Sequence, residues 1–348
     1  MNHSVLIFFA MLAFFLQGCS TSKSIEFSIE NNSVQEVWPQ LPEVPRYRYL
    51  GELHGEGFNA EKHANKSWLE LIAGFITGKP KPVVLKRPYS VHVSPENLVY
   101  VADVGLAAVM VFNLNDNTIQ LWKNATELQP FKAPVSIAFV KNEIWVSDVD
   151  LGEVFRFSKK GEPLGSFGSK ILKRPIGLVY DDKQGRLYVA DSSAHDIKVF
   201  NTEGALVETI GRYGEGDREF NFPSNIDYKD NKLYVSDTMN ARIQVFGING
   251  NNSDSKLIGN RGLRVGNTPR PKGVAVDSDE NIYIVESYYG YLLVFNKNGE
   301  FLLPISGGGR EIGRFDLPVG VTVDHLDRVF IADTFNGRVV MLQYLGND

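Results

Sequence analysis

The feature that most constrains this chain of 348 residues is a unit of 41 to 48 residues that occurs six times. Its clearest copy is residues 222–246, where a proline begins a short alternating strand, a polar turn follows, and a β-rich run ends on an acid. A second polar turn then leads to another apolar strand. The equivalent prolines are Pro88, Pro134, Pro175, Pro223, Pro271 and Pro318.

The acid that closes the second run keeps the same period and supports it independently. Patterns such as YVAD, WVSD and FIAD end on Asp103, Asp148, Asp191, Asp237, Glu286 and Asp333. A period of roughly 40 to 50 residues built from several short strands is typical of a β-propeller with one four-stranded blade per repeat. One blade cannot bury both of its faces, whereas six blades in a ring can. The sequence therefore predicts an all-β fold, a six-bladed propeller over residues 45–348.

The sixth repeat lacks an outermost strand of its own. It stops after a third strand at residues 338–345, whereas residues 47–52 read like the fourth strands of other repeats, such as residues 206–211. We expect residues 47–52 to complete the sixth blade, because closing the ring removes exposed sheet edges.

The N-terminal residues have the pattern of a bacterial lipoprotein signal. An apolar run at residues 5–16 is too short to cross a bilayer comfortably, and it leads into Leu16-Gln17-Gly18-Cys19, which resembles a lipobox. We therefore predict a signal peptide at residues 1–18 and lipidation, including palmitate, at Cys19, the only cysteine. An uncleaved anchor or an ordinary secretory signal is the alternative. Ser20 resembles the outer-membrane sorting pattern, so in a Gram-negative host we expect a lipid-anchored protein on the periplasmic side of the outer membrane.

Two segments before the first complete repeat do not follow its pattern. Residues 19–44 are rich in Ser, Asn and Glu and predict a tether, although their later half, including Trp38, could instead pack along the outside of the propeller. Residues 53–86 form an insertion in which apolar residues recur four apart over residues 59–77. This spacing predicts one amphipathic helix near residues 59–77.

The repeat resembles the NHL repeat. The resemblance rests on the proline, the YVAD-like strand, the connectors at residues 211–223 and 307–318, and an Asn-x-Arg element before the third strand, as in residues 240–243 and 336–339. It implies a six-bladed propeller that serves more often as a binding surface than as an enzyme. Relatives with six blades include a zinc-dependent amidating lyase and calcium-dependent lactonases. A metal-dependent lyase or lactonase with its site in the channel is therefore the alternative function.

The repeated acids and the histidines are weak candidates for a metal site. Each acid ends a strand at a hairpin, where a carboxylate accepts backbone N–H groups, so we expect a structural role. His92 falls in a first strand, whereas His195 and His325 fall in turns that open on opposite faces of the ring. Three ligands that cannot converge do not make a zinc site. No metal, cofactor or catalytic residue is predicted, and a channel Ca²⁺ or Zn²⁺ ion belongs only to the alternative function.

Positions two and four after each repeat proline are expected to face the channel. Most of these residues are small, and the polar exceptions are His92, Asn225 and Asp227, from the opposite blades 1 and 4. They make the channel a candidate site for a small ligand or ion, with a water-filled channel as the alternative.

Cations cluster just before the first strands, which places them on one rim of the ring. They are Lys86, Arg87, Lys173, Arg174, Arg270 and Lys272. On a chain with net charge -5 such a cluster indicates attraction of an anionic partner, such as an envelope protein or an acidic polysaccharide; solvated rim charges are the alternative. Because the whole chain is acidic, nucleic acid is not an expected partner. The sequence thus predicts a membrane-anchored periplasmic binding or scaffold protein.

Overall fold

The computed structural model describes residues 25–26, 29, 36–56, 82–248 and 255–346. The predicted signal peptide, Cys19 and the helix predicted near residues 59–77 lie outside these ranges, so they stay predictions. Within these ranges, no helix is both long and apolar enough to cross a membrane.

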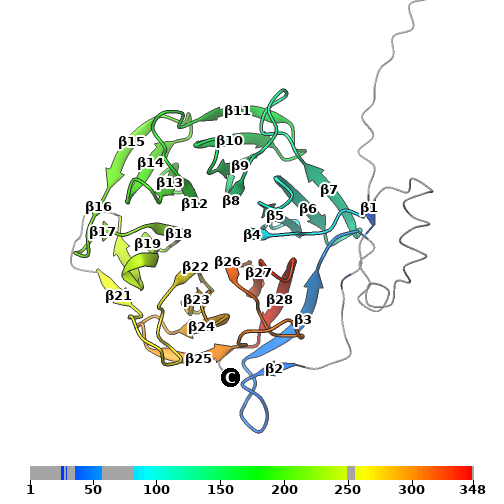
Figure 1. Ribbon diagram of the computed structural model, residues 1–348, viewed down its shortest axis with the longest axis vertical. Coiled ribbons are helices and arrows are strands. Elements are labelled where there is room, and N and C mark those ends of the chain that lie inside the picture. Colours follow the sequence, from blue (N-terminus) through cyan, green and yellow to red (C-terminus); the bar gives the residue numbers. More distant parts are fainter. Residues whose placement is uncertain (1–24, 27–28, 30–35, 57–81, 249–254, 347–348) are drawn as a thin grey trace, which may run out of the picture.

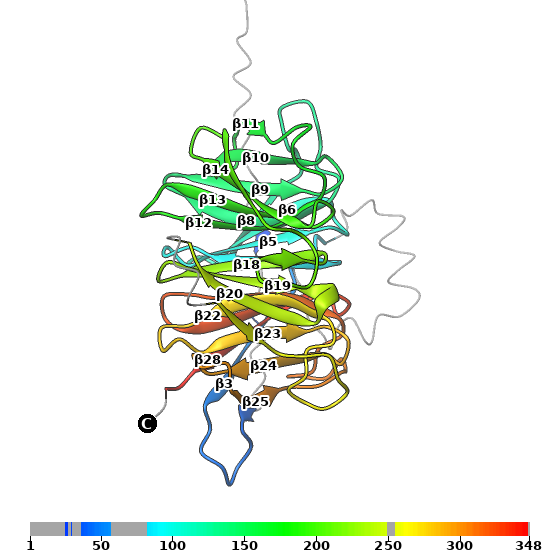
Figure 2. The same cartoon turned by 90° about the vertical axis from the view of Figure 1, so that its left-hand side faces the viewer.

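The described chain forms six antiparallel blades around a central channel, as predicted (Figure 1). Seen from its edge, the ring has strands that run between its two faces (Figure 2). Every innermost strand begins at a repeat proline, whose fixed φ and missing N–H suit the first residue of a strand. These strands are β4 (Pro88–Val93), β8 (Pro134–Val140), β12 (Pro175–Asp181), β18 (Pro223–Lys229), β22 (Pro271–Val276) and β26 (Pro318–Val323).

The second and third strands of every blade follow outward in chain order, as does the outermost strand in blades 1 to 5. The second strands are β5 (Leu98–Asp103), β9 (Glu143–Asp148), β13 (Arg186–Asp191), β19 (Lys232–Asp237), β23 (Ile282–Glu286) and β27 (Arg328–Asp333). The third strands are β6 (Ala108–Asn113), β10 (Glu153–Ser158), β14 (Asp196–Asn201), β20 (Arg242–Gly247), β24 (Tyr291–Phe295) and β28 (Arg338–Tyr344). The outermost strands are β7 (Thr118–Trp122), β11 (Pro163–Phe167), β15 (Leu206–Ile210), β21 (Lys256–Ile258), β25 (Phe301–Ile305) and β3 (Tyr47–Leu53).

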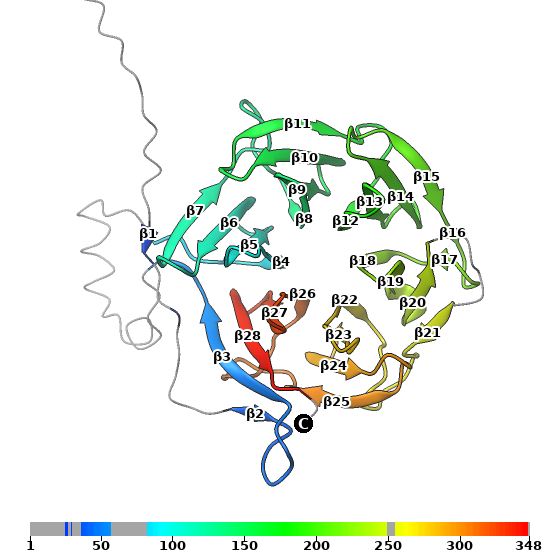
Figure 3. The same ribbon diagram turned by 180° about the vertical axis from the view of Figure 1, so that it is seen from behind.

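The outermost strand of the sixth blade comes from the N-terminal part of the chain. β3 pairs antiparallel with β28, with Tyr47 opposite Tyr344 and Leu53 opposite Val339. Figure 3 shows these two strands side by side. The prediction that residues 47–52 close the ring is therefore confirmed.

A few short elements decorate the blades. β1 (Ile25–Glu26) adds to β7, and β2 (Val37–Trp38) adds to β3. Trp38 packs against the apolar core between blades 5 and 6, so the later part of the predicted tether does lie against the propeller at this point. A parallel pair of β16 (Arg212–Tyr213) and β17 (Glu219–Phe220) and a 3₁₀ turn, η1 (Thr238–Asn240), belong to the connections of blade 4.

The core lies between neighbouring blades. Along β5, Val99 and Val101 pack in the cluster shared with blade 6, whereas Tyr100 and Ala102 pack in the cluster shared with blade 2. Successive side chains of a strand point to opposite faces, so each blade is apolar on both sides. Burial of one such Val or Phe contributes about 1.5–3 kcal/mol, which each blade gains only from its neighbours.

Candidate binding site at the central channel

One face of the ring carries the residues that precede the innermost strands and the turns between second and third strands; we call it the proline face. The repeated acids organise it. Asp103 accepts the backbone N–H groups of Lys86 (2.7 Å) and Arg87 (3.1 Å), and Asp191 accepts those of Lys173 (2.9 Å) and Arg174 (2.7 Å). As predicted, these carboxylates accept hydrogen bonds from the loop backbone.

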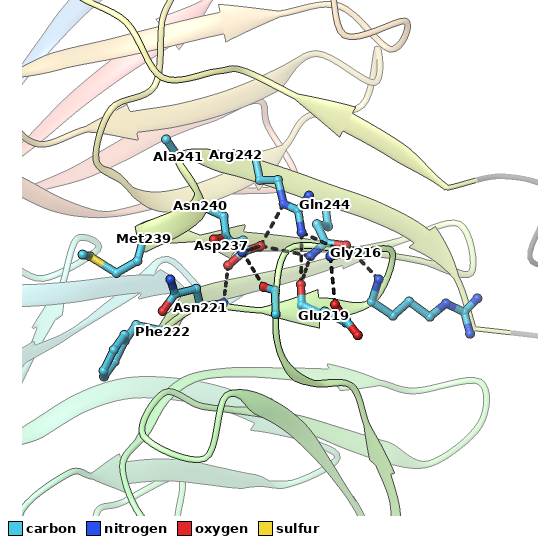
Figure 4. Close-up of polar contacts among 12 residues, drawn as sticks. Gly216, Glu219, Asn221, Phe222, Asp237, Met239, Asn240, Ala241, Arg242 and Gln244 are labelled. Atoms are coloured by element: carbon cyan, nitrogen blue, oxygen red, sulfur yellow. Dashed lines mark hydrogen bonds and ion pairs between the residues drawn. The ribbon is translucent and has the colours of Figure 1, made fainter.

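In blade 4 the acid also holds the Asn-x-Arg element, as Figure 4 shows. The donors to the Asp237 carboxylate are Asn221 N (2.7 Å), Asn240 Nδ2 (2.8 Å), Arg242 Nε (2.9 Å) and Gln244 Nε2 (3.0 Å). Arg242 also donates to the carbonyls of Gly216 (2.9 Å) and Glu219 (3.1 Å) in the preceding connector. The Asn-x-Arg element therefore fixes this connector, and Arg242 is not available to bind a ligand.

The channel is a cavity of about 290 Å³ lined by all six innermost strands. His92, Asn225 and Asp227 all line it, so the structure brings the three predicted channel residues to one cavity. β4, which carries His92, and β18, which carries the other two, face each other across the opening (Figure 1).

The two titratable channel residues lie in a wall that disfavours charge. Burial lowers the pKa of His92 to about 4, so its imidazole is neutral at physiological pH. Burial raises the pKa of Asp227 to about 6, against the lowering effect of hydrogen bonds from the backbone N–H groups of Tyr228 (2.8 Å) and Val276 (3.0 Å). Ser90 Oγ, also in the wall, has no hydrogen-bond partner among the described residues. The channel is thus suited to water or a small polar ligand.

The other two candidate histidines, His195 and His325, lie away from this cavity. His195 Nδ1 accepts the backbone N–H of Phe222 (3.2 Å) on the proline face, and His325 lies in the turn between β26 and β27. In the described part of the chain, no group of three or more His, Cys, Asp or Glu side chains could hold a metal ion.

Five of the six predicted rim cations have exposed side chains on the proline face: Lys86, Arg87, Lys173, Arg174 and Arg270. None of the five forms an ion pair with a described residue. The Arg87 guanidinium lies 5.9 Å from the centroid of the Phe335 ring, a cation–π distance. The positive charges of all five side chains therefore face the solvent.

Lys272 differs from the other five in its position and burial. It is the second residue of β22, partly buried at the proline-side mouth of the channel. Burial, then the charges of Arg270 and Arg174, lower the pKa of Lys272 to about 8. The same two arginines act on Tyr89, the second residue of β4, whose pKa is raised by burial. Arg174, Arg270, Lys272 and Tyr89 all stand at or directly beside the start of an innermost strand, at the proline-side end of the channel.

Sequence reasoning missed Tyr89 and a set of exposed apolar side chains on the proline face. Phe222 is 44% exposed, and Met239, Tyr288 and Phe335 are 52%, 64% and 53% exposed. The last three share one position in the second-to-third-strand turns of blades 4, 5 and 6. Their shared spacing from the repeated acid was the available signal. The proline face thus combines unpaired cations with exposed aromatic and methionine side chains.

Two of these turns contact the innermost strand of the next blade. Thr238 Oγ1 donates to the carbonyl of Pro271 (2.8 Å), and Thr334 Oγ1 donates to that of Pro88 (2.7 Å). Met239 and Phe335 directly follow these threonines. Each therefore lies beside a cationic position, Arg270 for Met239 and Arg87 for Phe335.

Comparisons with known proteins agree with this architecture. A family model described as "6-bladed beta-propeller" matches residues 168–257. The chain is 35% identical over 85 residues to NHL repeat-containing protein 2 of Bos taurus, a match that covers 21% of this chain and 12% of that protein. These matches and the six-bladed ring confirm the predicted resemblance to NHL-repeat propellers. The chain thus spans about an eighth of the length of that relative.

Two solved structures resemble the ring. An auxiliary nutrient binding protein from Bacteroides thetaiotaomicron has a TM-score of 0.57 and 13% identity, with 75% of this chain and 70% of that chain covered. Virginiamycin B lyase from Staphylococcus aureus has a TM-score of 0.53 and 15% identity, with 74% and 95% covered. At this identity the likeness shows the fold alone.

Proposed function

We propose that this protein is a binding module of the cell envelope whose proline face docks an acidic segment of another protein. The observation that carries the proposal is the set of cations on this face that form no ion pair with a described residue. The repeated acids close to them accept backbone N–H groups, so they are committed to holding the loops. A cationic surface of this kind attracts and orients an anionic partner.

The exposed apolar side chains favour a protein over a polysaccharide as that partner. Arginine, tyrosine, phenylalanine and methionine are enriched at protein interfaces, and arginine and tyrosine are among the residues that most often make their strongest contacts. Phe335 lies beside Arg87, and the turn that carries Met239 hydrogen-bonds Pro271, which follows Arg270, so one surface combines these residue types. Tighter binding of an acidic polysaccharide in the experiment that follows would identify a glycan, and not a protein, as the partner.

The proposal is tested with two polyanions and two charge-reversed variants. Wild-type protein is expected to bind poly-L-glutamate more tightly than polygalacturonate, with affinity that falls as salt rises. R87E/R174E/R270E should weaken binding at least about a hundredfold, because each change replaces attraction by repulsion. The matched control K141E/K160E/K183E alters the net charge equally, at exposed positions on the opposite face, and should bind nearly as wild type does.

Two results would count against the proposed surface. The first is equal loss of binding in both triple variants, which would mean that net charge alone acts. The second is tighter binding of polygalacturonate, which would assign the face to a glycan. Absence of any binding to either polyanion at low salt would remove the proposal altogether.

The location in the envelope rests on the lipobox-like segment and is tested separately. Replacing Cys19 with Ser should abolish incorporation of labelled palmitate and release the protein from membrane fractions. Retention of C19S in the membrane fraction would favour an uncleaved anchor.

A metal-dependent lyase or lactonase is the second candidate, favoured by the convergence of His92, Asn225 and Asp227 on one cavity. Its test is metal analysis of purified protein. A stoichiometric metal that is lost from the wild type on chelation and is absent from D227A would support this candidate over the binding module.

A further inference from the structure

We propose that Arg174, Arg270 and Lys272 together bind one carboxylate of the partner at the proline-side mouth of the channel. This inference rests on the proposed function and names the chemical group that the face recognises. It adds a specific, partly buried anchor to what would otherwise be a diffuse cationic surface.

Hydrogen bonds hold the backbone of the three cationic residues in place. The backbone N–H of Arg174 donates to Asp191 (2.7 Å), and that of Arg270 donates to Glu286 (3.1 Å). The carbonyl of Lys272 accepts from Ser224 Oγ (3.3 Å) in the neighbouring blade. Because their main-chain atoms are held before a ligand arrives, binding requires only the ordering of side chains.

The charges at this mouth are unbalanced. Burial and the charges of the two arginines disfavour the ammonium of Lys272, and none of the three cations forms an ion pair with a carboxylate of the described residues. Tyr89, from β4, faces the same two arginines as a neutral phenol. The positions equivalent to Lys272 in the adjacent strands β18 and β26 hold Ser224 and Val319, which do not titrate.

The repeated acid of blade 5 is already engaged in hydrogen bonds with the backbone. Glu286 accepts the backbone N–H groups of Arg270 (3.1 Å), Tyr288 (3.2 Å) and Tyr289 (2.8 Å), so its oxygens hold the loops. A carboxylate from outside is therefore the missing counter-charge. It would relieve the repulsion among three cations and accept their N–H groups, and charge-assisted hydrogen bonds of this kind are the strongest in proteins.

A ligand carboxylate changes the protonation of the site, which provides a specific signature. With the mouth empty, the pKa of Lys272 is about 8, so its ammonium is partly deprotonated at pH 8. A bound carboxylate favours the charged form, so binding at pH 8 takes up protons and affinity declines as pH rises above 8.

Isothermal titration calorimetry tests this directly, with an acetylated and amidated glutamate hexapeptide as the probe. Titrations at pH 8 in two buffers of different ionisation enthalpy report the protons taken up. We expect measurable uptake with wild type, a loss of at least about tenfold in affinity with K272M, and no proton uptake in that variant. K272R should retain affinity without proton uptake, because its guanidinium stays charged.

A matched control and a second peptide complete the design. K173M removes an exposed lysine from the same face and should bind with nearly wild-type affinity and proton uptake. The same hexapeptide with a free C-terminal carboxylate separates the two sources of the group. At least fivefold tighter binding of this peptide would assign the site to a chain terminus, and equal binding would assign it to side chains.

Failure of this inference differs from failure of the proposed function. If K272M binds the peptide with wild-type affinity and proton uptake while R87E/R174E/R270E does not bind, the anchor is wrong and the docking face stands. If wild type does not bind the peptide at low salt, both are wrong.

Discussion

Blades 4 and 6 carry the same Asn-x-Arg element but use it differently. In blade 4, Arg242 pairs with Asp237 (2.9 Å) and clamps its own connector. In blade 6, Arg338 pairs with Asp333 (2.7 Å) and also with Glu52 (2.8 Å), which belongs to the closing strand β3. His54 further contacts Glu52 (2.9 Å). The same element thus fixes a loop in one blade and also fastens the N-terminal strand in the other.

The comparison separates two classes of arginine on one face. Arg242 and Arg338 are largely buried and bound to carboxylates and carbonyls, so they belong to the scaffold. Arg87, Arg174 and Arg270 are exposed and have no such partners among the described residues. Only the exposed arginines are available to bind a ligand. Four sets of variants test this division between buried and exposed arginines.

The largest effect is expected from R338M. It leaves Glu52 and Asp333 buried without their cation, and loss of one partner from a buried ion pair costs about 3–5 kcal/mol. Urea denaturation should show this decrease in the free energy of unfolding, and hydrogen exchange should show faster opening of β3. A variant with β3 protected as in wild type would contradict the fastening role.

A smaller effect is expected from R242M. Asp237 keeps hydrogen bonds from Asn221, Asn240 and Gln244, so the loss should be about 1.5–3 kcal/mol by the same urea titration. Exchange at β3 should not change. If R242M and R338M prove equally destabilising, the second ion pair of Arg338 contributes nothing.

Acid pH should weaken blade 6 through Glu52. Burial alone would raise the pKa of Glu52, but the hydrogen bond from His54 and the charge of Arg338 bring it below its usual value of 4.5. A lowered folded-state pKa stabilises the fold above pH 4.5, and this stabilisation is lost as pH falls through the folded-state value. E52Q should therefore be about 1–3 kcal/mol less stable at pH 7 and lose less stability than wild type between pH 5 and pH 3, followed by urea titrations. Identical slopes for E52Q and wild type would exclude Glu52 as a source of acid sensitivity.

The smallest effect on stability is expected from R87E/R174E/R270E. Exposed side chains without ion-pair partners change the free energy of unfolding by about 0.5 kcal/mol or less. A loss as large as that of R242M would show that these arginines are structural, and would remove the division on which the proposed function depends.

The repeat predicted the ring because its landmarks are local. A proline that begins an innermost strand and an acid that ends the next strand recur within each unit, so register and blade count follow from spacing. The channel-facing positions of His92, Asn225 and Asp227 could also be predicted, because side chains along a strand alternate between its two sides.

Features that depend on contacts between distant blades could not be predicted. The ion pair of Glu52 with Arg338 joins residues separated by 286 positions. The cluster of Arg174, Arg270, Lys272 and Tyr89 involves three blades, and one residue of register decides whether Lys272 lies on the rim or at the channel mouth. Spacing within a repeat does not contain this information.

Closure by β3 has a consequence for how the molecule forms. Residues 47–53 are synthesised long before residues 338–344, with which they pair. Until then this strand has an open edge, and its native contacts have high contact order, which slows folding. Completion of the circle is therefore expected to be a late kinetic event, and chaperones that shield a single strand would have their greatest effect on this segment.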